Sequence, residues 1–192
     1  MSAFNATSMN RTPPASRWRL WIDGCGGFLL LSGDRWSVGG LSHDTMADIC
    51  VRADWPRQAG TINRAGSDYF WKGARTADSR KLISPGQPIP IPGTAAMTLE
   101  QPSPLSDSAV LRLNAPHRFD QHVDGVVLVN ETLLVGPSAD CHLRCRESTD
   151  RAILNWRGDR WLVKAGLAGD FRELKSGQRM VLRSLAMTLE EA

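Results

Sequence analysis

Two histidines and two aspartates occur close together in one stretch of the chain. His117 and His122 flank Asp120, and Asp124 follows. Imidazole and carboxylate groups are the side chains that bind zinc and related metals. A spacing of five residues does not place both histidines on one face of a strand, and the surrounding residues are typical of a loop. We therefore predict no metal site here, and nothing else in the sequence indicates a cofactor.

The cysteines are the next residues with chemical potential, and there are four of them: Cys25, Cys50, Cys141 and Cys145. An even number is compatible with disulfides, but the chain shows no secretory signal and is longer than the small disulfide-rich scaffolds. We therefore expect free thiols. Cys141 and Cys145 would share one face of a strand, which favours core packing over zinc binding or redox work.

Catalytic motifs are not found in the sequence. It contains no Gly-x-Ser-x-Gly elbow, no phosphate-binding loop and no His-Glu-x-x-His pair. We therefore expect a protein that is not an enzyme. Catalytic residues can be scattered through a sequence, so an unrecognised enzyme stays as an alternative, which a concave pocket with converging polar groups would favour.

Composition and charge narrow the class of partner. The chain is 42% hydrophobic and 22% charged, as in ordinary soluble domains. Its net charge of +3 comes without a run of Lys and Arg, so nucleic acid is not the expected partner. No stretch approaches the ~18 apolar residues of a membrane span, and the first 16 residues lack the features of a signal peptide. We predict a cytoplasmic protein that binds neither nucleic acid nor membrane.

The elements that must position any site occur twice, because the chain contains a tandem repeat. GFLLLSGDRWSVGG at 27–40 returns as GVVLVNETLLVGP at 125–137, and MTLE at 97–100 returns at 187–190. Between these anchors, residues 47–73 align with 139–165 without a gap. The repeat predicts a flexible tail (1–16), a first domain (17–100), a linker (101–108) and a second domain (109–192).

Period-two alternation predicts strands throughout both repeats. RWRLWID at 17–23 places Trp18, Leu20 and Ile22 on one side, and a glycine-rich turn then leads into FLLL at 28–31, which predicts a hairpin. Each closing MTLE segment places its Met and Leu inward. Short strands separated by frequent turns favour an all-β fold made of two antiparallel β-sandwiches.

The order of these features resembles the forkhead-associated (FHA) domain, a small β-sandwich that in many proteins binds phosphothreonine peptides. The first repeat carries the resemblance in Val38-Gly39, Ala47-Asp48-Ile49, Ile62, Tyr69-Phe70-Trp71, Gly86-Gln87 and Ile89. The second carries it in Val135-Gly136, Ala139-Asp140-Cys141, Leu154, Trp161-Leu162-Val163, Leu174 and Gly177-Gln178. The resemblance covers most of both repeats and implies two FHA-like sandwiches.

The family's phosphate-binding positions differ in this chain. The arginine expected after Val-Gly is Gly40 in one repeat and Pro137 in the other. Where the family has Ser-Arg-x-His, the first repeat offers only Arg57. The second repeat offers a set that the resemblance implies could bind phosphate, consisting of Ser148 and Arg151 assisted by Arg144 or Arg146.

Two tryptophans at the ends of predicted strands are candidate contacts for a partner. Trp55 precedes Pro56 in a presumed loop, and Trp156 follows a strand. An exposed loop tryptophan is a good anchor for a protein partner. The alternative is that both pack over the edge of the sandwich, as most tryptophans in a small protein must.

Taken together, the sequence favours a non-enzymatic protein-interaction or scaffold module built of two degenerate FHA-like domains. The contact loops would be 54–60 in the first repeat and 146–151 in the second. A module that binds phosphothreonine peptides is the alternative from the same fold. Exposed strand edges also leave self-association open.

Overall fold

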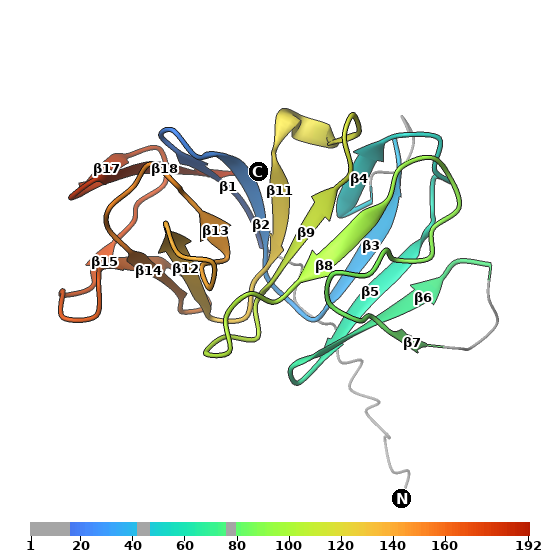
Figure 1. The fold of residues 1–192 in the computed structure, drawn as a ribbon, viewed down its shortest axis with the longest axis horizontal. Helices are drawn as coiled ribbons and strands as arrows, with labels where there is room; N and C mark the ends of the chain where they lie inside the picture. Colours follow the sequence, from blue (N-terminus) through green and yellow to red (C-terminus); the bar gives the residue numbers. More distant parts are fainter. Residues whose placement is uncertain (1–15, 42–46, 76–79) are drawn as a thin grey trace, which may run out of the picture.

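The computed structural model describes residues 16–41, 47–75 and 80–192. Its regular elements are β-strands together with one short 3-10 helix, η1 (Asp120–His122), which confirms the predicted all-β fold. Three sheets lie side by side in Figure 1, with a seven-stranded sheet between a five-stranded and a six-stranded one. The predicted tail falls almost wholly outside the described residues. No helix in the described part of the chain is long and apolar enough to cross a membrane.

The three sheets contain every strand of the structure. The seven-stranded sheet consists, in spatial order, of β17 (Arg179–Leu182), β18 (Leu185–Glu191), β1 (Arg17–Ile22), β2 (Gly26–Leu31), β11 (Gly125–Leu128), β9 (Ala109–Leu113) and β8 (Met97–Glu100). The six-stranded sheet consists of β10 (Arg118–Phe119), β4 (Ile49–Arg52), β3 (Arg35–Gly40), β5 (Gly60–Ala65), β6 (Asp68–Gly73) and β7 (Lys81–Leu82). The five-stranded sheet consists of β13 (Leu143–Arg144), β12 (Thr132–Gly136), β14 (Ala152–Trp156), β15 (Trp161–Ala165) and β16 (Arg172–Glu173).

The two repeats exchange their opening strands within the seven-stranded sheet. β1, which opens the first repeat, pairs with β18, which closes the second. β9, which opens the second repeat, pairs with β8, which closes the first. The predicted hairpin is confirmed as the antiparallel pair β1 and β2, and its counterpart is β9 with β11. The boundary at 101–108 therefore separates the repeats in sequence, whereas their strands share one sheet.

The middle strands of this sheet are apolar on both faces because both faces are covered. In β2, Leu29 and Leu31 enter one core, while Phe28 and Leu30 enter the other. β11 does the same and pairs with β2 in parallel. A strand buried on two sides reads as a continuous apolar run, as FLLL and VVLV do. Outer strands such as β1 alternate, since one of their faces is left polar.

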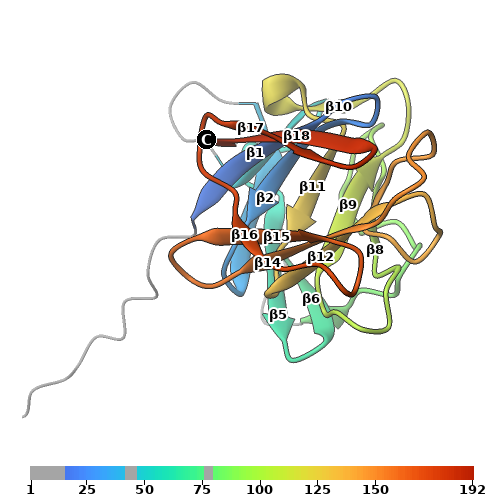
Figure 2. The same ribbon diagram turned by 90° about the vertical axis from the view of Figure 1, so that its left-hand side faces the viewer.

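Two cores define two lobes. Figure 2 views the molecule from the side of the five-stranded sheet, with β14 and β15 in front of β5 and β6. In the first lobe the six-stranded sheet packs on one face of the seven-stranded sheet, around Trp36, Ile62 and Met97. In the second lobe the five-stranded sheet packs on the opposite face, around Leu20, Trp161 and Met187. The inward prediction for the closing strands is confirmed, because both MTLE segments bury their Met and Leu.

A disulfide between Cys25 and Cys145 corrects the expectation of four free thiols. Cys25 lies in the turn between β1 and β2 of the first repeat, and Cys145 follows β13 of the second. The strand exchange brings these turns together although 120 residues separate the two cysteines. Cys50 and Cys141 are free and buried, and burial raises the pKa of both thiols.

Candidate functional site

A proline-rich segment of the first repeat replaces a strand of the second. The sequence PIPIPG at 88–93 occupies the place between Gly86-Gln87 and β8 that RMVL of β17 occupies in the second repeat. Proline has no N–H to donate to a strand ladder. Ile89 still points into the first core and donates its N–H to the Met97 carbonyl, whereas the prolines on either side are exposed. Residues 88–92 therefore form an extended segment with exposed prolines, and they do not form an edge strand. We call them the proline segment.

The loop that follows β4 holds the C-terminal end of the proline segment in place. Both the N–H and the hydroxyl of Thr94 donate to the Asp54 carboxylate at 2.9 Å. These two bonds lower the pKa of Asp54 below its ordinary value. Trp55 donates its indole N–H to the Ala95 carbonyl, and only 6% of its surface is exposed. Trp55, a predicted partner contact, is thus a buried residue that positions the proline segment.

An apolar hollow of about 190 Å³ opens between the proline segment and the edge of the six-stranded sheet. Its lining includes Trp71, Ala59, Ala74, Pro56, Pro90 and Pro92. A second hollow of about 130 Å³ adjoins it, and Trp71, Lys81 and Pro90 line both. We call the two together the proline slot. Polar groups do not converge in it, since apolar side chains form most of its walls.

The slot lies beside β7, the last strand of the six-stranded sheet. Ile83 donates its N–H to the Tyr69 carbonyl, and Lys81 pairs with Trp71. Hydrogen-bonded and non-hydrogen-bonded pairs alternate along an antiparallel ladder. Leu82, which lies between these two residues, therefore directs its N–H and C=O away from β6. Its side chain is 58% exposed.

The first lobe cannot hold a family-type arginine after Val-Gly, because its own backbone fills the space. A Cβ atom on Gly40 would lie 2.4 Å from the Trp55 carbonyl oxygen, and one on Gly39 would lie 1.9 Å from that of Arg57. The Gly40 N–H donates to the Pro56 carbonyl at 2.8 Å. Arg57 is exposed on this same loop. The loop 54–60 is thereby packed down on β3.

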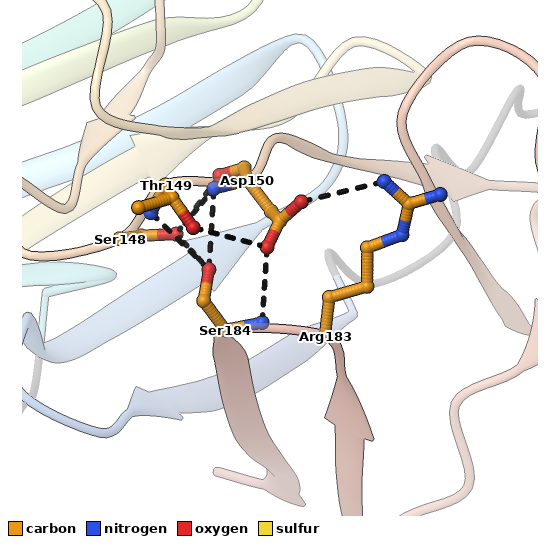
Figure 3. A network of polar contacts seen from close by, with 5 residues as sticks. All are labelled: Ser148, Thr149, Asp150, Arg183 and Ser184. Atoms are coloured by element: carbon orange, nitrogen blue, oxygen red, sulfur yellow. Dashed lines mark hydrogen bonds and ion pairs between the residues drawn. The ribbon is translucent and has the colours of Figure 1, made fainter.

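The corresponding loop of the second lobe satisfies its polar groups internally, as Figure 3 shows. The Ser148 hydroxyl donates to the Asp150 carbonyl, accepts from the Asp150 N–H and lies 2.9 Å from the Ser184 hydroxyl. The Asp150 carboxylate accepts from the Ser184 N–H at 3.1 Å and pairs with Arg183 at 3.4 Å. The hydrogen bonds from Ser184 lower the pKa of Asp150. The Asp150 carboxylate thus occupies the Ser184 N–H and the Arg183 guanidinium, which a bound anion would otherwise use.

The predicted phosphate ligands of the second repeat are not brought together around an open site. Arg151 forms an ion pair with Asp140 at 2.9 Å, and Ser148 is only 8% exposed. Arg144 donates to the Pro137 carbonyl. Arg146 is exposed, one residue beyond Cys145. Within the described residues, the best-placed hydroxyl and guanidinium are thus already engaged.

Trp156 packs against the second core and is only partly exposed. Its ring centroid lies 4.2 Å from that of Trp18 and 5.3 Å from that of Trp161. Such aromatic clusters stabilise cores and leave a small free edge for a partner. Trp156 therefore shares in core packing, which was the alternative to a contact residue.

The residues considered for a metal lie on the connection between β9 and β11. Asp120 accepts from Arg52 at 3.1 Å, and Asp124 accepts from the Gly27 N–H at 2.9 Å. Among the described residues, no group of three His, Cys, Asp or Glu side chains could hold a metal ion.

His142 is a buried titratable group that sequence reasoning missed. It follows the free Cys141 and is 1% exposed, and its Nδ1 accepts from the Leu134 N–H at 3.0 Å. Burial lowers its pKa to about 4, a shift that the Ser108 backbone opposes. Its counterpart in the first repeat is Cys50. The ring of His142 thus lies in the interior of the second lobe, away from solvent.

The slot residues were also missed, although the sequence carried a signal for them. Three prolines alternate with isoleucines at 88–92, where the second repeat has an apolar strand. A proline-broken strand next to an aromatic strand indicates an opened sandwich edge.

No family model, curated protein or solved structure matches this chain.

Proposed function

We propose that the chain is a non-enzymatic protein-interaction module whose binding surface is the proline slot of the first lobe. The observation that carries the proposal is the open apolar hollow beside Trp71, next to an exposed edge strand. Apolar hollows with few polar groups bind the side chains of other proteins well. The degenerate FHA-like loops serve instead to build the body that holds the slot.

The internal hydrogen bonding of the second lobe supports the same proposal. Asp140 and Asp150 neutralise Arg151 and Arg183, so a phosphate would have to displace a carboxylate from each. One observation favours phosphothreonine binding as a second candidate function. Arg146 is exposed beside the loop that the family uses for phosphate.

Retention of peptide libraries on the immobilised protein tests the proposal. The two libraries are degenerate around a central threonine or phosphothreonine and are otherwise identical. We expect the protein to retain both libraries, and to lose both in Ala74→Phe, which fills the slot from an exposed position. Retention confined to phosphopeptides and lost in Arg151→Ala would replace the proposal with the second candidate. Absence of any retention would also overturn it.

A further inference from the structure

Among the described residues that line the proline slot, the charged side chains are both cationic. Arg75 and Lys81 lie on its rim, and no Asp or Glu is among the residues that line either hollow. Neither cation forms an ion pair with any described residue. Cations on the rim of an apolar floor favour an apolar group that carries negative charge beside it. The rim therefore selects acidic neighbours for whatever side chain enters the slot.

The geometry of β7 indicates the conformation of such a partner. The outward N–H and C=O of Leu82 can pair with one residue of an added extended segment. Side chains of an extended segment alternate between faces. The residue paired with Leu82 would lie on the face of Leu82. The next residue along the segment would direct its side chain to the face shared by Lys81 and Trp71.

The equivalent edge of the second lobe lacks the tryptophan, the exposed leucine and the proline segment. Val163 stands where Trp71 stands, and Glu173 stands where Leu82 stands. The strand β17 fills the place of the proline segment and pairs with β18. Arg172 is retained opposite Val163, as Lys81 is opposite Trp71. Charge at this position is therefore common to both lobes, whereas the slot occurs in the first.

We propose that the proline slot binds an extended segment of a partner protein in which an apolar side chain is flanked by acidic residues. This inference rests on the proposed function, since it names the chemistry of the partner for the same site. The apolar side chain enters the hollow beside Trp71. The flanking carboxylates pair with Lys81 and Arg75.

Fluorescence polarisation with the full chain tests this. The probe is a labelled heptapeptide with a central leucine, a threonine on each side and two glutamates at each end. We expect saturable binding that weakens about tenfold in Lys81→Glu, the equivalent of ~1.4 kcal/mol. Arg172→Glu is the matched control and should change the dissociation constant less than about twofold, because it reverses the same charge without a slot.

Two further peptides separate the contribution of the apolar side chain from that of the acidic residues. Replacing the central leucine with glycine should abolish binding, and replacing the glutamates with lysines should do the same. Equal binding of the glycine peptide would overturn the inference, because charge alone would then explain the affinity. Equal effects of Lys81→Glu and Arg172→Glu would overturn it as well. If the glutamate probe fails while neutral library peptides are still retained through the slot, the acidic preference is wrong and the proposed function stands.

Discussion

The first and second lobes are built from copies of the same repeat, yet they differ in how their loops pack and in whether the edge beside the closing strand is open. The first lobe packs its 54–60 loop onto Gly39 and Gly40 and keeps an open hollow at the proline segment. The second lobe closes the corresponding edge with β17 and engages its 146–151 loop with Ser184 and Arg183. The two lobes therefore differ at the segment that precedes their closing strands. In the first lobe three prolines stand where the second lobe has the strand β17.

An arginine placed after Val-Gly should affect the two lobes most differently. In the first lobe, Gly40→Arg places a side chain against the Trp55 backbone, so we expect a loss of more than about 3 kcal/mol in the free energy of unfolding. In the second lobe, Pro137→Arg lies in a partly exposed loop and should cost about 1 kcal/mol or less. Urea unfolding followed by tryptophan fluorescence measures both. Similar losses in the two variants would contradict the packing difference between the lobes.

The disulfide is the covalent link between the two repeats. Closing a loop of this length adds about 5 kcal/mol to the free energy of unfolding, because it restricts the unfolded chain. The Cys25→Ser and Cys145→Ser double variant should lower stability by that amount. Thiol titration of the denatured wild type should find the thiols of Cys50 and Cys141 alone. Reaction of all four cysteines would contradict the pairing and would favour the reducing, cytoplasmic setting that the sequence predicts.

The buried His142 gives the second lobe a pH dependence in the weakly acidic range. Its pKa is about 4 in the folded protein and about 6.5 when unfolded, so between these values the unfolded chain binds more protons. Stability contributed by the neutral ring is present above pH 6.5 and is lost as pH falls toward 4, by about 3 kcal/mol in total. His142→Asn should remove this part of the slope in urea unfolding at a series of pH values. An unchanged slope would show that the ring titrates normally.

The exposed ion pair between Arg151 and Asp140 should have the smallest effect. Both side chains are partly exposed, so Arg151→Ala is expected to cost about 0.5 kcal/mol. Chemical denaturation resolves such a difference when the slopes are equal. A loss above about 2 kcal/mol would mean that the pair is a structural element of the loop.

Much of the fold could be predicted from the sequence, but the strand exchange could not. Alternation located the hairpin and the inward Met and Leu of both closing strands. The closing strands at 97–100 and 187–190 are identical in sequence, so either could pair with β1 or β9. The turn residues Cys25 and Cys145 meet because of this exchange. Their disulfide was therefore also hidden from sequence reasoning.

The candidate site was harder to predict than the fold for a related reason. The resemblance to FHA domains directs attention to Ser148 and Arg151, and neither sequence position shows that Asp140 and Asp150 engage the surrounding donors. Trp55 looked exposed beside a proline but is buried over the proline segment. Side-chain engagement depends on contacts between distant loops, which residue types do not specify.

The most direct test of the account is to map the binding surface on the whole protein by amide chemical shifts. The acidic heptapeptide with a central leucine is titrated into the isotope-labelled chain. Among the described residues, the account predicts shifts confined to 54–60, 68–75 and 81–94, with residues 146–151 and 183–184 unchanged. Shifts centred on 146–151 and 183–184 would contradict it, because the second lobe would then carry the binding site.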